Sequence, residues 1–513
     1  MMKLKRQFLM MLTVTLILGI ALTGCGSTAP TTASSAPAAS SAAASATSET
    51  ASESAVSEKT AELKWYFPGG WPQTEQDRIF AEVNTMLKEK INVTCEFVPS
   101  SYGDYDNKIS VVIASAQDYD VCFTSNWINN YVKNVSKGAF LPLDELLVNY
   151  APKTLAAVPS SFWDATKVKG KIYAVVNQQI SARTPNISIP EELAKKYAFD
   201  PATYVPGDLS TLNPFIEKVF AENPDLYADC NAIFAEYLGM DALAGVNIPG
   251  AILVNDPSMT VINQFTSEPF LKNVAVIREW NQKGWTLSTK RISAGSDVKT
   301  PGVNQTILTV GGAYKPGGAV FDSKGLGYNV IQLPAAKPIL STSAIIATMQ
   351  AVSTNSKNPE AAMKMLELFN NDPDAFMLLN YGIKGEHWDV DGSGQLIDGP
   401  QIANYNPNVP WMFATNYMQI PQAGQPADVW EQTKKMNDEG LKSPTLGFSF
   451  DGEPVKGEIA KCSAIYDEYA RGIQLGVYSE ADITEMVSKM NAAGSDLIIA
   501  EMQKQVNEWK AAK

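Results

Sequence analysis

Aromatic rings and amide groups recur near the ends of apolar segments of this chain, and these are the side chains that bind sugars. A sugar ring has apolar C–H faces that stack on Trp or Tyr, and hydroxyl edges that hydrogen-bond to Asn, Gln, Asp or Arg. Since most aromatic residues of a large domain belong to its core, we expect about half of this set to line a ligand cleft. The set consists of Trp71, Asn126, Trp127, Gln178, Tyr314, Tyr381, Trp388 and Trp411.

The side chains required for common hydrolytic chemistry are scarce. His387 is the only histidine of the chain, and neither H-E-x-x-H nor G-x-S-x-G occurs, so the sequence indicates no catalytic triad and no zinc site. We interpret His387 as a structural hydrogen-bonding residue, with ligand contact as the alternative. A glycosidase-type carboxylate pair has no supporting pattern among the many acidic residues. We therefore expect a protein that is not an enzyme.

A glycine-rich stretch at Gly311–Gly318 has the composition of a phosphate-binding loop. It lacks the Gly-Lys-Ser/Thr ending of a P-loop, so the phosphate interpretation is weak. A loop at the edge of a cleft fits better, because glycine permits close approach of the backbone to a ligand. In that position Tyr314 would face the ligand.

A second short motif resembles half of a calcium-binding loop. Asp389, Asp391 and Ser393 stand at the first ligand positions of an EF-hand, but Pro400 replaces its bidentate glutamate. We interpret this stretch as the acidic tip of a hairpin, with a calcium site as the weaker alternative. No cofactor and no metal are expected.

The segment that follows the amino-terminal region alternates apolar strands with amphipathic helices. Strands are predicted at 63–67, 91–98 and 119–123, and the helices between them carry apolar residues at helical spacing. This order is typical of a parallel α/β sheet with right-handed crossovers. Ligands of such sheets bind beyond the carboxyl ends of the strands, so Trp71 and Trp127 either face a ligand at the crevice or only pack its rim.

The amino terminus has the layout of a secretory signal, with a basic start, an apolar run and small residues before Cys25. The apolar run is shorter than the roughly 20 residues that a membrane-spanning helix needs. Its Leu-Thr-Gly-Cys ending resembles the lipobox of bacterial lipoproteins, which implies a signal peptide at 1–24 and acylation of Cys25. Ser, Ala, Thr and Pro dominate the rest of 25–62, so we expect a disordered linker there.

Charge and cysteine placement exclude several classes of partner and bond. The formal net charge is −13, and no Lys/Arg-rich run follows the signal, so nucleic acid and anionic lipid are poor partners. Cys95 and Cys122 fall in predicted strands that flank a third strand, which holds them too far apart for a disulfide. We expect these two cysteines, with Cys230 and Cys462, to be buried thiols.

Four parts of the chain resemble the extracellular solute-binding proteins of ABC importers, family 1, a group rich in oligosaccharide binders. The most specific block is Tyr381–Trp388, which resembles the branch with an extra carboxyl-terminal region of unassigned role. Lys384 departs from that branch, where Glu is usual, and this puts any ligand contact at the position in doubt. Asn358–Met363 precedes this block and forms one part with it. The other three parts are the lipobox with its tether, Gly138–Leu143 with Gly170–Ala174, and Leu446–Phe450 with Ala493–Trp509.

The resemblance implies an α/β, periplasmic-binding-protein-like fold of type II, with two lobes joined by a hinge. We place the amino-terminal lobe at 63–177 and 305–355. The carboxyl-terminal lobe, with the family-specific region, is placed at 178–304 and 356–513. Closure of the lobes would bury a ligand between them. The expected hinge crossings are Val176–Gln179, Asp297–Asn304 and Ser353–Asn358.

The resemblance also implies a function. The chain is expected to be a monomeric, lipid-anchored solute-binding protein on the outer face of a Gram-positive cell membrane. It would capture a solute, an oligosaccharide by preference, and deliver it to the membrane permease subunits of an ABC importer. The alternatives are a binder of peptides or another polar solute, an extracytoplasmic sensor domain, and a surface glycan-processing enzyme.

Overall fold

The computed structural model describes residues 59–230, 235–287 and 305–512. The predicted signal peptide, Cys25 and nearly all of the predicted linker lie outside the described residues, as does the predicted crossing at 297–304. Within the described ranges, no helix is long and apolar enough to span a membrane.

The folded body contains two large hydrophobic cores. The buried apolar residues of the first core lie within 63–182 and 340–414. Those of the second core lie within 187–336 and 448–506. The chain therefore leaves each core and returns to it, as expected for a two-lobed α/β protein with more than one crossing.

The first core is built on a five-stranded sheet with the order β2-β1-β3-β15-β6. β1 pairs in parallel with β2 and β3, whereas β15 is antiparallel to β3 and β6. β1 begins inside the predicted linker. It lies between the strand of Cys95 and the strand of Cys122, as predicted. Cys95, Cys122, Cys230 and Cys462 are all buried free thiols, as predicted. The strands are β1 (Ala61–Gly69), β2 (Val93–Ser101), β3 (Val121–Thr124), β15 (Met349–Val352) and β6 (Ala174–Val176).

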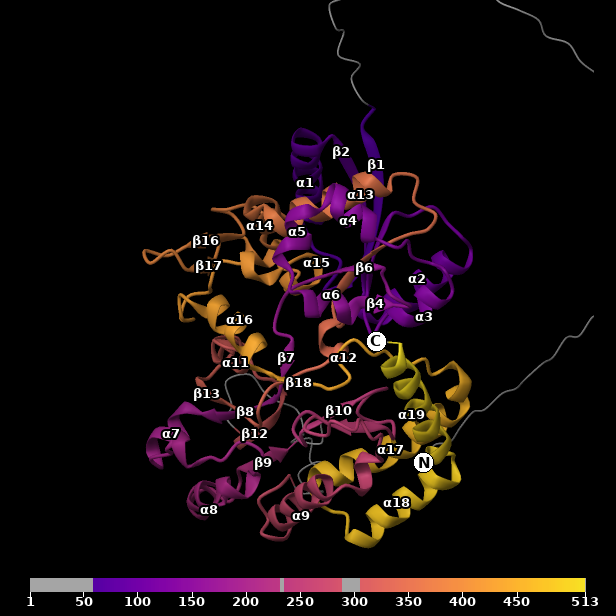
Figure 1. Cartoon of the computed structure of the whole chain (residues 1–513). Helices are drawn as coiled ribbons and strands as arrows, with labels where there is room; N and C mark the ends of the chain where they lie inside the picture. Colours follow the sequence, from indigo (N-terminus) through magenta and orange to yellow (C-terminus); the bar gives the residue numbers. More distant parts are fainter. Residues whose placement is uncertain (1–58, 231–234, 288–304, 513) are drawn as a thin grey trace, which may run out of the picture. The chain divides into compact units, whose positions relative to one another are not determined.

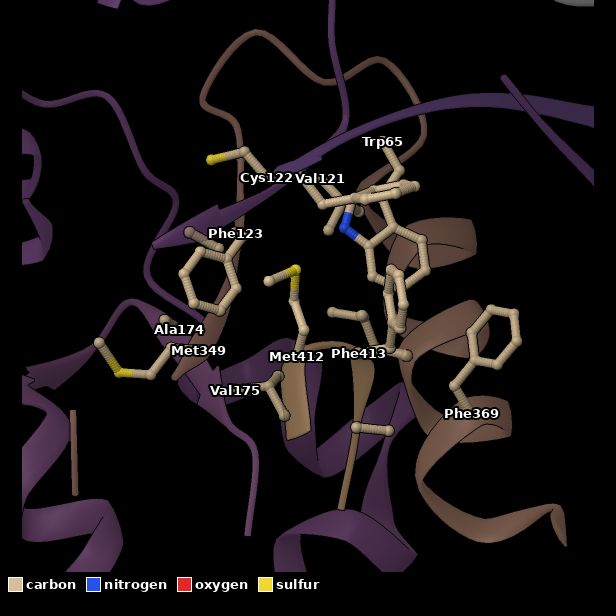
Figure 2. Close-up of a cluster of buried hydrophobic side chains, with 14 of the residues drawn as sticks. Trp65, Val121, Cys122, Phe123, Ala174, Val175, Met349, Phe369, Met412 and Phe413 are labelled. Carbon is tan, nitrogen blue, oxygen red and sulfur yellow. The ribbon is translucent and has the colours of Figure 1, made fainter. Parts of the chain in front are cut away.

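Large side chains from distant parts of the sequence pack beside this sheet (Figure 2). The ring centroid of Trp65 on β1 lies 5.5 Å from that of Phe413 and 5.7 Å from that of Phe369. The indole nitrogen of Trp65 donates a hydrogen bond of 2.9 Å to the Gln350 side chain on β15. A buried tryptophan is thus both packed and satisfied, and it joins β1 to residues that follow almost three hundred positions later.

The helices of the first core follow the expected capping and periodicity. α1 buries Ile79, Phe80, Val83 and Leu87 on one face, and the Ser101 hydroxyl accepts a hydrogen bond from the Asp104 N–H at the start of α2. These helices are α1 (Gln76–Ile91), α2 (Tyr102–Ala114), α3 (Tyr131–Ser136), α4 (Asp144–Tyr150), α5 (Pro152–Ala157), α6 (Ser160–Thr166), α13 (Pro359–Asn371), α14 (Pro373–Tyr381) and α15 (Pro410–Phe413). Two hairpins accompany them, β4 (Lys167–Val168) with β5 (Lys171–Ile172), and β16 (Trp388–Val390) with β17 (Leu396–Asp398).

The second core is built on a four-stranded sheet with the order β13-β8-β12-β9. β8 is antiparallel to both neighbours, and β12 is parallel to β9. The strands are β13 (Val330–Pro334), β8 (Pro185–Pro190), β12 (Thr306–Ala313) and β9 (Tyr227–Cys230), with a separate hairpin of β10 (Met240–Ala242) and β11 (Ala251–Leu253). The helices are α7 (Glu191–Lys196), α8 (Asn213–Glu222), α9 (Glu268–Gln282), α11 (Gly318–Leu326), α17 (Lys456–Leu475), α18 (Glu480–Ala492) and α19 (Ser495–Ala511).

Three chain crossings between the cores pair into a small sheet of their own, with the order β18-β14-β7. β7 (Ala182–Arg183) is antiparallel to β14 (Ile339–Leu340), which is parallel to β18 (Leu441–Lys442). We call this three-stranded sheet the hinge sheet. α12 (Thr342–Ile345) follows β14, and α16 (Val429–Glu439) precedes β18; β7 and β18 can be followed between the two larger sheets in Figure 1.

The predicted lobe boundaries are wrong in their second halves. Residues 305–336 belong to the second core, because β12 pairs with β8 and β9 and buries Ile307, Leu308 and Val310 there. Residues 356–414 belong to the first core, because β15 pairs with β3 and carries α13 onto the first sheet. The crossings are accordingly β7, β14 and β18. The segment Ser353–Asn358 is not a crossing, since it joins β15 to α13 within the first core.

Candidate functional site

A cavity of about 430 Å³ is lined by residues of both cores. The first core contributes the loop after β3, with Asn126, Trp127 and Asn130. The second core contributes the segment after β10 and the segment around Phe448. We call this cavity the cleft pocket. It lies where the lobe architecture predicts a ligand, beyond the carboxyl end of a strand of the first sheet.

The wall on the side of the first core is the indole of Trp127, which is 50% exposed. Its Nε1 donates a hydrogen bond of 2.8 Å to the carbonyl oxygen of Ala347. The rings of Phe123, Tyr102 and Trp411 lie 6.0, 6.2 and 6.4 Å from it, centroid to centroid. The indole is therefore held at its edge while half of its surface stays free for stacking.

The loop that carries Trp127 is fixed by its own hydrogen bonds. The hydroxyl oxygen of Ser125 accepts hydrogen bonds from the N–H groups of Trp127 and Ile128, at 3.2 and 2.9 Å. The hydroxyl of Thr124 donates to the carbonyl oxygen of Asn129, at 2.5 Å. Asn129 has φ of 47°, a left-handed conformation that Asn tolerates better than most residues. This loop presents a preorganised aromatic surface.

Three charged residues line the cleft pocket, Arg183 on β7, Glu236, and Asp241 on β10. We call these three residues the floor of the pocket. Asp241 is buried, and its carboxylate accepts a hydrogen bond of 3.1 Å from the Thr445 hydroxyl. The Nε of Arg183 is buried and has no hydrogen-bond partner within the part of the chain that the structure describes. Hydrogen-bonding groups without strong protein partners are suited to the hydroxyl edge of a ligand.

Burial changes the ionisation of all three groups. It raises the pKa of the Asp241 carboxyl, against the hydrogen bonds from Ser443 and Thr445. It raises the pKa of Glu236, which the neighbouring Arg183 guanidinium partly opposes. It lowers the pKa of Arg183, which Glu236 partly opposes. The floor thus combines one cation and two acids that are costly to desolvate, an arrangement typical of binding sites.

A further wall of the cleft pocket is formed by Phe448, Ser449 and Phe450, which belong to the segment 446–450 that the sequence singled out. Phe448 is buried against the second core, and its ring lies 5.8 Å from that of Trp509. The indole nitrogen of Trp509 donates a hydrogen bond of 3.1 Å to the Gly447 carbonyl, and the Gly447 N–H donates one of 2.8 Å to the Thr342 hydroxyl oxygen. The last helix, α19, therefore holds a wall of the pocket in place.

The structure brings together three of the eight predicted site residues. Asn126 and Trp127 line the cleft pocket, and Trp411 packs beside Trp127. Gln178 is buried and does not line the pocket, and its backbone carbonyl oxygen accepts a hydrogen bond of 2.7 Å from the Asn416 N–H. Tyr314 is half-buried and donates its backbone N–H to the Thr184 carbonyl oxygen.

Trp71, Tyr381 and Trp388 belong to the first core instead of a cleft. The Trp71 ring lies 5.6 Å from the ring of Phe80, because the loop after β1 folds back onto α1. The indole nitrogen of Trp388 donates to the carbonyl oxygen of Gly382 at 2.9 Å. Burial raises the pKa of Tyr381 well above its usual value. These aromatic residues pack the first core and do not line the cleft pocket.

The predicted hairpin tip uses its carboxylate for its own turn. Oδ1 of Asp391 accepts hydrogen bonds from the N–H and hydroxyl of Ser393 and from the N–H of Gln395. Oδ1 of Asp389 accepts one from the N–H of Val390. Across the described ranges, no group of three or more His, Cys, Asp or Glu side chains is placed to hold a metal ion.

His387 is buried in the first core. Its Nδ1 accepts a hydrogen bond of 3.1 Å from the Ile383 N–H, and its Nε2 lies 3.4 Å from a carboxylate oxygen of Glu75. The Glu75 carboxylate also pairs with Arg78 at 2.8 Å, and Arg78 pairs with Glu386. This chain of contacts ties the Tyr381–Trp388 block to the start of α1. The contacts are those of a structural hydrogen-bonding residue.

Sequence reasoning missed the charged floor. Arg183, Glu236 and Asp241 belong to no motif, and isolated charged residues are usually read as surface residues. Their burial arises only when the hinge sheet, the β10 hairpin and the 443–445 segment pack together. A single arginine close to a predicted hinge crossing was the available signal, and it is a weak one.

Two α/β cores, three crossings between them and a pocket lined by both define the fold of the bilobal solute-binding proteins. This confirms the predicted fold class. A carbohydrate ABC transporter substrate-binding protein from Streptococcus pneumoniae is 26% identical over 463 residues, which cover 87% of this chain and 90% of that protein. Residues 444–511 match the family described as a domain of unknown function, DUF3502.

Solved structures of similar proteins agree in fold. The N-glycan transport solute binding protein NgtS of Streptococcus pneumoniae superposes with a TM-score of 0.76 at 23% identity, covering 88% of this chain and 100% of that chain. Its complex with Man5GlcNAc gives a TM-score of 0.67 at 24% identity, covering 88% and 99% of the two chains. A solute-binding protein from Bifidobacterium longum subsp. infantis gives 0.59 at 13% identity, covering 87% and 98%.

Proposed function

We propose that the protein is the extracytoplasmic solute-binding component of an ABC importer and that its solute is an oligosaccharide. The observation that carries this proposal is the cleft pocket, which is lined by the half-exposed Trp127 together with Arg183, Glu236 and the buried Asp241. Stacking on an indole with hydrogen bonds around it is the arrangement that a sugar requires. The carbohydrate-binding relatives support the same solute class.

The membrane context belongs to the proposal as well. The Leu-Thr-Gly-Cys25 sequence favours a lipid anchor, and the Ser/Ala/Thr-rich linker would hold the folded body away from the bilayer. An anchored binding protein would hand its solute to permease subunits in the same membrane. Radiolabelled palmitate should label the expressed protein, and Cys25→Ser should abolish both the label and retention in the membrane fraction. Retention of the label would contradict the anchor at Cys25.

Enzymatic turnover is not part of the proposal. The similar proteins are named as binding proteins. In the floor of the cleft pocket, burial raises the pKa of Glu236 and of Asp241, and hydroxyl groups hydrogen-bond to the Asp241 carboxylate. A binder of peptides or another polar solute remains the alternative within the same fold, since a polar floor also suits amide groups.

The test is a thermal-shift panel on the purified protein with neutral oligosaccharides, including Man5GlcNAc, and with peptides and amino acids. A ligand that binds the native state alone stabilises it by about 2.7 kcal/mol at a hundredfold excess over Kd. We expect a rise in Tm with at least one oligosaccharide series. A rise with peptides alone would replace the sugar assignment and keep the binding function, and no rise with any solute would contradict both.

A further inference from the structure

A second cavity, of about 700 Å³, lies against the second sheet and is lined in part by Gln179, Arg183, Asn186, Lys315 and Asp322. We call it the sheet-face pocket. It is lined by residues of β8, of β12 and of α11. The glycine-rich stretch that the sequence predicts to be a loop at the edge of a cleft contributes Gly311, Gly312 and Lys315 to it.

The base of the sheet-face pocket is a polar face of a sheet whose other face is core. Along β8, Ile187 and Ile189 are fully buried in the second core, while Asn186 and Ser188 alternate with them on the opposite side. Asn186 and Ser188 are nevertheless only 7% and 5% exposed. A sheet face under a helix is normally apolar, because buried polar groups cost free energy unless they are hydrogen-bonded. The polar residues here therefore indicate a ligand.

One oxygen of Asp322 is the shared acceptor of this polar face, and the side-chain nitrogen of Gln332 donates to it and to the Ser188 hydroxyl oxygen. The Asn186 amide and the Ser188 hydroxyl both donate to one oxygen of Asp322, at 3.4 and 3.3 Å, which is long for such bonds. Oε1 of the neighbouring Gln332 is buried and has no hydrogen-bond partner among the residues that the structure describes. Polyhydroxylated ligands offer donors and acceptors at close spacing, so they would satisfy this layer.

The backbone at the edge of the pocket is open to a ligand. The pairing of β12 with β8 shifts register between Gly311 and Ala313, and Gly312 adopts φ of 67°. A Cβ atom at Gly312 would meet only the Asn186 side chain, at 3.9 Å. Glycine at this bulge therefore leaves space for a ligand to approach the backbone closely.

The sheet-face pocket adjoins the cleft pocket. Arg183 lines both cavities. Trp127 of the cleft pocket donates to the carbonyl oxygen of Ala347, and Gln179 of the sheet-face pocket donates to the hydroxyl oxygen of Thr348, the next residue, at 3.0 Å. Two hydrogen bonds on consecutive residues place the rims of the two pockets side by side.

The charges of the sheet-face pocket balance. Arg183 and Lys315 are matched by Asp229 and Asp322, so an anionic ligand gains no net attraction. The Nζ of Lys315 lies 4.3 Å from the centre of the Phe321 ring, where it is held by a cation–π contact. A neutral ligand with many hydroxyl groups fits this composition best.

We propose that the sheet-face pocket is a second sugar-binding region, which holds the distal residues of a neutral oligosaccharide whose first residue stacks on Trp127. Arg183 then contacts the ligand at the junction of the two regions. This inference rests on the proposed function. It predicts that affinity rises with the length of the glycan, and that the two pockets contribute separately to that affinity.

The test is isothermal titration calorimetry of the full chain with a short and a long glycan of one neutral series, for which we use Man1GlcNAc and Man5GlcNAc. Asn186→Ala should lower the affinity for the long glycan about tenfold, as expected for loss of a hydrogen bond in a buried site. It should leave the affinity for the short glycan unchanged. Trp127→Ala should lower both affinities. Asn223→Ala, whose amide donates to Tyr197 away from both pockets, should change neither.

If Asn186→Ala lowers the affinity for both glycans equally, or for neither, the inference is overturned and the proposed function stays intact. Absence of binding to the wild-type chain by any neutral glycan would overturn both. Should Asn186→Ala fold poorly, amide exchange in the wild-type chain replaces it as the readout. Residues 309–313 should then be protected by Man5GlcNAc and not by Man1GlcNAc, and equal protection by both would contradict a separate distal region.

Discussion

The predicted tryptophans show how one side-chain type serves two purposes in this chain. Trp71 and Trp388 are at most 8% exposed and pack in the first core, whereas Trp127 is 50% exposed at the cleft pocket. Both Trp71 and Trp127 follow strands of the same sheet. The difference lies in what holds each ring, since Trp71 is enclosed by aromatic neighbours while Trp127 is held at its Nε1 edge.

Truncation of the two residues should separate stability from binding. Trp71→Ala should lower the free energy of unfolding by about 3–5 kcal/mol, because it opens a large cavity in the core. Trp127→Ala should lower it by only about 1 kcal/mol, the contribution of one hydrogen bond. Chemical denaturation of the two variants measures both values. Equal losses would contradict the assignment of Trp127 to the pocket wall.

Asp241 should make stability depend on pH. Burial raises its pKa, so the folded state binds this proton more tightly than the unfolded chain does. The resulting stabilisation is present below the usual carboxyl pKa of roughly 4 and is lost as pH rises through the raised folded pKa. The Tm of the wild type should therefore fall relative to that of Asp241→Asn as pH is raised from about 4. A constant difference, or a relative gain by the wild type, would contradict this account.

Residue types and their placement after predicted strands predicted part of the site. Trp127 and Asn126 were found because ligands bind beyond strand ends. The same rule failed for Trp71, because the Glu75 N–H donates to the Asn404 carbonyl at 3.0 Å and thereby ties the loop after β1 to a distant segment. Contacts across that separation leave no local pattern in the sequence. The charged floor was missed for the same reason.

At the scale of elements, the hinge sheet is the feature that connects the two cores. Its strands have two residues each and come from three separate crossings. Hinges consist of a few loop or element-terminal residues that absorb changes in φ and ψ, and strands of two residues provide such residues. Gly440 connects α16 to β18 of this sheet. A Cβ atom at Gly440 would lie 2.6 Å from the Cβ of Ala182 on β7.

Gly440→Ala should therefore disturb the hinge sheet. The added methyl group has to displace β7, and overpacking of this kind costs about 1–3 kcal/mol. Gly457→Ala is the matched control, because a Cβ atom at that position in α17 meets nothing within 4 Å. Thermal unfolding of both variants measures the effect. A Tm that falls equally in both, or in neither, would contradict close packing at the hinge sheet.

Periodicity predicted the first three strands and their parallel order, and the structure confirms them. It could not predict that β12 pairs with β8 and β9, or that β15 pairs with β3 and β6. A hydrophobic period shows which face of a strand is buried and does not identify its partner. The assignments of 305–336 and 356–414 to lobes failed for this reason, since each depends on one long-range pairing.

At the scale of the whole molecule, the two cores share a pocket and the chain passes between them three times. A ligand can shift the equilibrium between the open and closed arrangements only by the free energy with which it binds the closed state better than the open state. Contacts on both cores are therefore required for capture. The Trp127 loop lines the pocket from the first core, and the 241–248 segment lines it from the second.

Amide hydrogen exchange with and without a glycan that raises Tm tests this claim most directly. The glycan should slow exchange in two separate segments, 124–132 of the first core and 241–248 of the second. Exchange in the exposed helix surface of α18 should not change. Protection confined to one core, or protection in neither segment at a saturating glycan concentration, would contradict binding between the two cores.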